Sequence, residues 1–273
     1  VIYISDTNIF NKINIKKSIP LKTKKNIFYA DPFYIAHNGN DYIFYEKFDY
    51  KVNKGILACS KIKDNKLLDE KVILEKEYHL SYPFIFKYKD LFFLLPEMSY
   101  AKKQDIYIST QFPYEWKLHK TIFKNVYSAD PTIYQDDNDN FWLFISQSYD
   151  PFNDLNSELY LYKINNLNDF QLTSHLQNPI IIDSRKARSA GNIFKFDNQI
   201  IRPSQNTNSK AYGNSLNFNK IVKLNINEFE EEYMDNIKFK DTNIIGTHHF
   251  SLYREKSLFD VCFRKFKWNI KKY

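Results

Sequence analysis

The sequence has little of several features that would each assign it to a particular class of protein. Only two of its 273 residues are cysteines, Cys59 and Cys262, and two cysteines cannot form a disulfide framework that stabilises a chain of this size. We therefore expect buried thiols of a cytoplasmic protein, although a single disulfide is also compatible with the sequence. The longest apolar runs are short, such as "LFFLL", whereas a membrane-spanning helix needs roughly 20 apolar residues. With five glycines, the chain has no phosphate-cradling glycine loop and no Gly-x-Ser-x-Gly nucleophile elbow.

Aromatic residues, in contrast, are abundant. They make up 18% of the chain, with 24 Phe and 21 Tyr, and such side chains favour pleated, half-buried surfaces. The composition therefore predicts an all-β protein, and a hydrophobic content of 43% is enough for a sizeable core. The net charge of +7 suits an anionic ligand, substrate or membrane surface, but a solvated lysine-rich surface is the simpler explanation.

One sequence pattern recurs along the chain. "NIFYADPFYIAHNGNDYIFYEKF" (26–48) and "VYSADPTIYQDDNDNFWLFIS" (126–146) both read small residue, Asp-Pro, apolar run, polar turn and aromatic-rich run. Three further segments fit the pattern with a different pair at the Asp-Pro position, which we call the anchor: Tyr82-Pro83, Gly191-Asn192 and His248-His249. A period of roughly 50 residues filled with short alternating strands is typical of β-propellers. The sequence therefore predicts a single five-bladed β-propeller domain over residues 1–273.

Each unit is expected to begin with a strand at its anchor and to continue through a hairpin with Asn/Asp/Gly turn chemistry. "GILACSKI", "DIYIST", "ELYLYKI" and "NFNKIVKL" supply third strands, and "KVILEK" and "WKLHKTIF" supply outer strands. "NINEFEEEYMDNI" (225–237) is expected to form a short helix or an acidic loop.

The anchors are expected to meet in space, because the inner strands of a propeller all start at the same end of the central axis. Proline lacks an N–H and suits the first position of a strand, so the Asp31 and Asp130 carboxylates should stand at the mouth of a shared pocket. The alternative is that each Asp-Pro pair only opens a turn.

Residues in register with the anchors complete a candidate site. We assign catalytic roles to Asp31, Asp130 and Glu97. The remaining candidates would bind substrate: His79, Tyr82, Glu46, Arg188, Arg202, Gln205 and His248. Carboxylates accept hydrogen bonds from sugar hydroxyls, and guanidinium groups pair with carboxylate or phosphate, so this set suits a polyhydroxylated sugar. The alternative is that the aspartates only bind ligand or support the fold, and that the two glutamates satisfy neighbouring backbone or arginine groups.

Metal, cofactor and nucleic-acid sites are not expected. "DND" (137–139) matches a metal-holding Asp-x-Asp pattern, but it falls in a hairpin turn, where these residues are common anyway. On a strand, the side chains of His248 and His249 would point to opposite faces and could not share a metal. The aromatic residues alternate as in core strands, which argues against a nucleic-acid surface.

Several motifs resemble a known family. "YADPF", "YHLSYPF", "ADPT", "ARSAGNIF", "RPSQ", "YGNSL" and "GTHHF" are similar to the propeller domain of plant glucosamine inositolphosphorylceramide transferases and their bacterial relatives, itself akin to arabinanase- and levansucrase-type propellers. The resemblance covers residues 26–266 and implies a five-bladed propeller that transfers or recognises carbohydrate. In the hydrolase-like propellers a carboxylate heads blade two, where this chain has Tyr82.

Our leading functional hypothesis at this point is a glycosyltransferase of bacterial surface polysaccharide biosynthesis, acting on capsule or lipopolysaccharide. It would use a phosphate-activated donor, either a nucleotide sugar or phosphoribosyl pyrophosphate, with Asp31 as base and Arg188, Arg202 and His248 facing the phosphates. A non-catalytic carbohydrate-binding module and a glycoside hydrolase are the alternatives. Expected partners are the sugar donor, a glycan acceptor, and membrane-associated assembly enzymes or a fused enzyme domain. The expected location is the cytoplasm, with peripheral association at the inner membrane.

Overall fold

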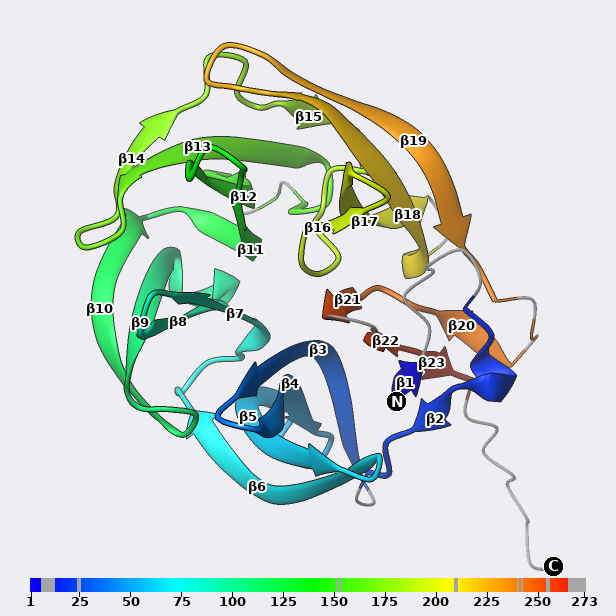
Figure 1. Cartoon of the computed structure of the whole chain (residues 1–273). Helices are drawn as coiled ribbons and strands as arrows, with labels where there is room; N and C mark the ends of the chain where they lie inside the picture. The colour runs from blue at the N-terminus through cyan, green and yellow to red at the C-terminus, as the bar shows by residue number, and fades with distance from the viewer. Residues whose placement is uncertain are drawn as a thin grey trace, which may run out of the picture.

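Five antiparallel sheets, each built on four strands, surround a common axis in the computed structural model of the chain (Figure 1). The structure describes residues 1–5, 13–23, 26–150, 152, 154–208, 211–239, 241, 243–253 and 256–264. Each sheet is one blade, and successive blades follow one another along the chain, so the prediction of a five-bladed β-propeller is confirmed. The outer strands predicted at "KVILEK" and "WKLHKTIF" are also present.

The strands of the blades are as follows, from the inside outward for blades one to four. Blade one holds β3 (Ile27–His37), β4 (Asn40–Asp49), β5 (Lys54–Lys63) and β6 (Lys66–Leu74); blade two holds β7 (Ser81–Tyr88), β8 (Leu91–Glu97), β9 (Lys103–Gln111) and β10 (Glu115–Lys124). Blade three holds β11 (Tyr127–Gln135), β12 (Phe141–Ser148), β13 (Glu158–Asn166) and β14 (Gln171–Ser174), with β15 (Ile181–Ile182) also paired to β13. Blade four holds β16 (Phe194–Phe196), β17 (Gln199–Asn208), β18 (Ala211–Leu224) and β19 (Phe229–Ile237).

Blade five joins strands from both ends of the chain. Its order is β2 (Ile19–Pro20), β1 (Ile2–Ser5), β22 (Lys256–Asp260) and β21 (Phe250–Tyr253), and Figure 1 shows β1 beside β22. A separate two-stranded ladder pairs β20 (Ile244–Gly246) with β23 (Cys262–Phe263), and two short 3-10 helices cover Ile15–Lys17 and Ser99–Ala101. Strand β1 thus closes the ring by completing this blade, a feature that was not predicted from the sequence.

Ile4 should be one of the side chains on which ring closure depends. It is 2% exposed and lies opposite Leu258 in the β1–β22 pairing. Truncating a buried isoleucine leaves a cavity, so Ile4→Ala is expected to lower the free energy of unfolding by about 2–5 kcal/mol. Chemical denaturation followed by tryptophan fluorescence would measure the loss. Ile19→Ala, on the neighbouring strand but 37% exposed, is the matched control and should change stability by less than half as much; equal losses would contradict a closing role for β1.

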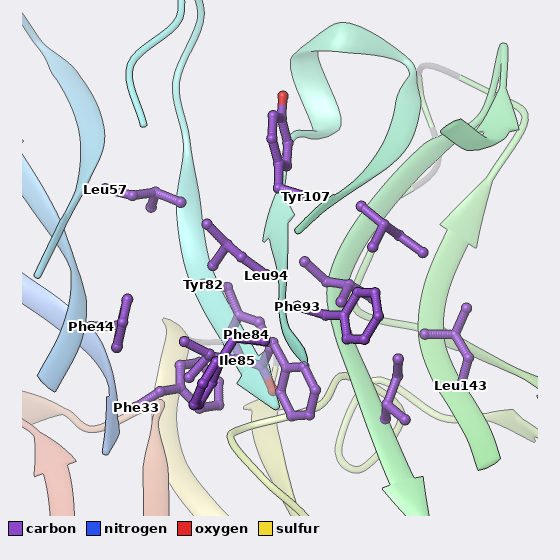
Figure 2. Close-up of a cluster of buried hydrophobic side chains, with 14 of the residues drawn as sticks. Phe33, Phe44, Leu57, Tyr82, Phe84, Ile85, Phe93, Leu94, Tyr107 and Leu143 are labelled. Carbon is purple, nitrogen blue, oxygen red and sulfur yellow. The ribbon is translucent and has the colours of Figure 1, made fainter. Parts of the chain in front are cut away.

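Aromatic side chains fill the wedges between the blades. The Phe33 ring of blade one meets the Tyr82 and Phe84 rings of blade two edge-on, with centroids 5.0 and 5.5 Å away. Figure 2 shows these rings with Phe44 and Phe93 in one buried cluster. Edge-to-face packing of flat rings fills such wedges densely, which accounts for the high aromatic content.

Two smaller expectations need correction. Residues 229–237 form the outer strand of blade four rather than a helix or an acidic loop, with glutamates along a largely exposed edge. Cys59 is buried as expected, but Cys262 is exposed, and both thiols are free. Within the described residues, no helix has the length and apolar content that crossing a bilayer requires.

Candidate functional site

The first three anchors are β-bulges with a left-handed backbone. Asp31, Tyr82 and Asp130 have φ angles of 50°, 45° and 49°, and strand pairing shifts register at each of them. A left-handed backbone costs a non-glycine residue about 1–2 kcal/mol. The proline that follows each one loses no ladder bond, because the bulge leaves that position unpaired. The prediction that Asp-Pro starts the strand was therefore wrong: the pair lies inside β3 and β11.

The bulges turn these side chains inward, where they are buried rather than standing at an open mouth. Asp31 is 5% exposed and Asp130 is 2% exposed. Strand register adds two more acids, since Glu46 pairs with Ala30 and Glu97 with Ser81, each immediately before an anchor. Both glutamates are also buried. Such a concentration of buried carboxylates is costly unless cations or protons compensate it.

Arg188 compensates one half of the cluster. Its Nε donates to Asp130 Oδ2 at 2.6 Å and its Nη2 donates to Glu97 Oε2 at 2.9 Å. Gln205 Nε2 donates to the same Asp130 oxygen at 2.9 Å, and Asn156, which the sequence analysis missed, accepts from Arg188 Nη1. The structure thus brings together predicted residues from blades two, three and four.

This half of the site retains a proton at neutral pH. Burial raises the pKa of Asp130 to about 8; Arg188 pulls it down, while the neighbouring Glu97 carboxylate pushes it up. One guanidinium cannot fully neutralise two buried carboxylates. Asp130 can therefore donate a proton near neutral pH.

The other half surrounds Asp31. The backbone N–H of Tyr82 donates to Asp31 Oδ2 at 3.1 Å, and His248 Nε2 lies 3.5 Å from Asp31 Oδ1. His248 Nδ1 lies 2.7 Å from Oδ2 of Asp260, whose other oxygen accepts the backbone N–H groups of His248 and His249. Asp260, which ends β22, the second strand of blade five, was not predicted from the sequence.

His248 carries the positive charge in this half of the site. Burial disfavours a charged His248, but the carboxylates of Asp260 and Asp31 outweigh burial and raise its pKa to about 10. Burial raises the pKa of Asp31 to about 7, against the lowering effect of His248, with Asp260 and Asp130 raising it further. Burial lowers the pKa of His249 to about 3, although the Asp260 carboxylate raises it. The expectation that the two histidines point to opposite faces was wrong, because 247–249 lie outside the strands and His249 Nδ1 also lies 3.6 Å from Asp31 Oδ1.

These shifts predict how stability depends on pH. An ordinary histidine loses its proton near 6.5, whereas folded His248 keeps it to about 10, so the folded state binds more protons in this window. Asp130 acts in the same direction up to about 8. Thermal unfolding midpoints should therefore decrease as the pH rises from 6.5 to 10, and His248→Gln should flatten the upper part of this decrease. An unchanged slope in that variant would contradict the assignment of the charge to His248.

The same three side chains are the ones that could hold a metal ion. In the part of the chain that the structure describes, ligand atoms of Asp31, His248 and Asp260 all lie within 4.8 Å of one another. A histidine must be deprotonated to bind a metal, and this imidazole is held protonated between two carboxylates. The expectation that the site binds no metal stays a prediction.

The remaining predicted residues divide into two groups. Tyr82 reaches across to other blades, with its hydroxyl 2.7 Å from Thr132 Oγ1 and bonded to the backbone of Gly191. His79 Nε2 lies 3.5 Å from Glu46 Oε1, and burial lowers the pKa of His79. Arg202, by contrast, is not brought to the cluster.

The guanidinium of Arg202 is engaged within its own blade. It is 1% exposed and bonds both carboxylate oxygens of Glu231 at 2.8 Å and the backbone oxygen of Lys186. Arg185 likewise pairs with Asp183. Arg188 and Arg202, the two arginines predicted to face phosphates, are therefore both engaged by carboxylates.

Comparison with known proteins identifies a family and a fold. Residues 8–257 match the family described as "Glucosamine inositolphosphorylceramide transferase 1, N-terminal". A relative from Oryza sativa subsp. japonica, named glucosamine inositolphosphorylceramide transferase 1, is 31% identical over 209 residues, which cover 75% of this chain and 27% of the relative. The chain thus spans about a quarter of the length of the curated relatives it matches.

Solved structures share the fold. The catalytic domain of a GH62 α-L-arabinofuranosidase from Coprinopsis cinerea gives a TM-score of 0.61 at 15% identity, covering 86% of this chain and 80% of that one. A mutant α-L-arabinanase from Cellvibrio cellulosa gives a TM-score of 0.56 at 16% identity, covering 85% and 84%.

The hypothesis of a bacterial capsule or lipopolysaccharide glycosyltransferase was wrong. The curated relatives are plant proteins named for a sphingolipid, and the solved propellers of similar fold are glycoside hydrolases. The pairing of the buried Arg202 guanidinium with both oxygens of Glu231 gives a physical reason against a donor diphosphate at that residue.

Proposed function

We propose a function for this chain, which belongs to the family of the N-terminal domain of glucosamine inositolphosphorylceramide transferases. The chain binds a glycan at its axial acid cluster and cleaves a glycosidic bond there. The observation that carries this proposal is the convergence of two aspartates from different blades on one buried cluster. Arg188 and Gln205 hold Asp130, and His248 and the Tyr82 N–H hold Asp31. Asp130 holds a proton at neutral pH, while Asp31, with a pKa of about 7, is ionised in a large fraction of molecules. Glycoside cleavage requires this combination of an acid and a base or nucleophile.

In the proposed step, Asp130 protonates the departing glycosidic oxygen as the bond between that oxygen and the anomeric carbon breaks. Asp31 accepts a proton from the water whose oxygen bonds to the anomeric carbon. Arg188 and Gln205 keep the Asp130 carboxyl in place, and His248 orients Asp31. A sugar hydroxyl in place of water would give transfer, the activity in the relatives' name.

Glycan binding without turnover is the second candidate. It is favoured by the two close contacts that Arg188 makes to Asp130 and Glu97, because a carboxylate fixed by a guanidinium is a ligand-holding rather than a proton-transferring group.

A panel of synthetic glycosides, oligosaccharides and glucosamine-bearing inositol phospholipids would separate the two candidates. Released reducing sugar or transferred sugar measures turnover, and calorimetry measures binding. The proposal predicts turnover that Asp130→Asn reduces by about 10²–10⁴-fold while Asp137→Asn, an exposed hairpin residue, leaves it unchanged. Binding without turnover by the unaltered protein would establish the second candidate instead.

A further inference from the structure

Three loops at one end of the propeller carry large apolar side chains into solvent. Tyr50 is 53% exposed, Val52 66%, Tyr100 74% and Phe152 94%. The exposed Lys51 and Lys102 belong to the first two of these loops. We call these six residues the rim. Among the described residues, the other strongly exposed aromatics are Tyr149, in the same loop as Phe152, and Tyr233, on the outer strand β19.

All three loops lie at the end where the chain enters the inner strands. The Tyr50 N–H donates to the backbone oxygen of Asn26, directly before β3, and the Lys102 backbone oxygen accepts from Val126, directly before β11. Ser148, at the start of the third loop, pairs with Tyr127 at the start of β11. The aspartates of the site lie only a few residues farther along these same strands.

The rim is continuous with the acid cluster. The Tyr100 ring centroid is 6.3 Å from that of His79, whose Nε2 lies 3.5 Å from Glu46. Asn156, in the loop of Phe152, accepts a hydrogen bond from Arg188. A surface that covered the rim would therefore lie against residues that contact the acid cluster directly.

We propose that the rim docks on an anionic lipid surface, with the site facing the headgroups. Aromatic and aliphatic side chains interleaved with lysines are the composition that binds such surfaces, where apolar groups enter the interface and cations meet lipid phosphates. A neutral sugar chain would stack on the aromatic rings, but it would gain little from contact with Val52 or with the two lysines. The third loop also carries Asp150 and Asp154, which each accept a backbone N–H of their own loop and keep their negative charge. The attraction to anionic lipid therefore depends on Lys51 and Lys102, and the apolar side chains supply the rest of the binding.

Docking itself is independent of glycosidic chemistry and of the proposed function. Co-sedimentation with vesicles tests the docking alone, and it can be repeated with Asp31→Asn, so that failure of docking and failure of turnover are separate results.

The expected result is binding to phosphatidylcholine vesicles that contain phosphatidylserine and about tenfold weaker binding to phosphatidylcholine alone. The pair Val52→Asp with Tyr100→Ser should weaken binding about tenfold or more. The matched control is Val72→Asp with Tyr233→Ser, at exposed positions on outer strands, and it should bind as the unaltered protein does.

Charge is tested in the same way. Lys51→Gln with Lys102→Gln should weaken binding to anionic vesicles, whereas Lys63→Gln with Lys89→Gln, exposed in hairpins at the opposite end, should not. Absence of vesicle binding, or equal losses in rim and control variants, would overturn the proposal. Loss of soluble oligosaccharide affinity in the rim variants without any vesicle binding would assign the rim to sugar stacking and would overturn it as well.

Discussion

Replacing Arg188 by methionine is expected to lower the free energy of unfolding by about 3–5 kcal/mol. The buried Asp130–Glu97 pair, which shares one proton at neutral pH, then has no cation to offset its remaining negative charge. The guanidinium is 11% exposed and contacts Asp130 at 2.6 Å and Glu97 at 2.9 Å. Methionine keeps much of the side-chain volume, so the loss reports the charges rather than a cavity. Chemical denaturation at neutral pH measures it.

Two further variants make the interpretation specific. Arg185→Met removes an exposed arginine that pairs only with Asp183, so the unfolding midpoint should not change. Adding Glu97→Gln to Arg188→Met leaves only the protonated Asp130 carboxyl in the pair, so it removes the stranded negative charge and should recover a large part of the lost stability. Lowering the pH should rescue Arg188→Met in the same way, by protonating the carboxylates. Equal losses for Arg185 and Arg188, or no recovery in the double variant, would contradict a charge-compensating role.

The ring could be predicted from the sequence because its repeats are carried by local patterns. Each anchor is followed by a hairpin whose turn residues and alternating strands are visible within about 20 residues. Strand β1 could not be found this way, since a four-residue strand has no distinguishing pattern and its partner β22 lies at the other end of the chain. Residues 229–237 were misassigned because an exposed outer strand rich in glutamate lacks the apolar alternation that marks a strand.

The candidate site was predictable where it depends on the repeat, and not where it depends on side-chain direction. Asp31, Asp130 and Arg188 are within the cluster because bulges and strand order place them there. Arg202 and Gln205 were treated as equivalent, yet residues three apart on a strand point to opposite faces, so only one could reach the axis. Gln205 bonds Asp130, and Arg202 bonds Glu231 instead.

The bulge geometry was also beyond the sequence. Asp-Pro is compatible with a strand start, a turn or a bulge, and the choice is made by pairing with the second strand. The left-handed backbone of Asp31 follows from that pairing, and it determines which substitution can be used to test the function.

Asp31→Asn is expected to reduce glycoside turnover by about 10²–10⁴-fold while leaving glycan affinity within a few-fold of the unaltered protein. Asparagine cannot accept the proton that the proposed step removes from water. It does keep the hydrogen bond from the Tyr82 N–H, through its amide oxygen, and it tolerates the φ of 50° that this position requires. Steady-state rates and calorimetric affinities on the same preparation measure the two quantities.

The choice of asparagine separates loss of chemistry from loss of fold. Asp31→Ala removes both the Tyr82 bond and the side chain that makes a left-handed backbone tolerable, so it should lower the unfolding midpoint more than Asp31→Asn does. A folded Asp31→Asn protein that binds glycan and turns it over at the rate of the unaltered protein would remove Asp31 from the reaction. The base would then have to be sought among Glu46 and Asp260, the other buried carboxylates that act on the charge of Asp31 and His248.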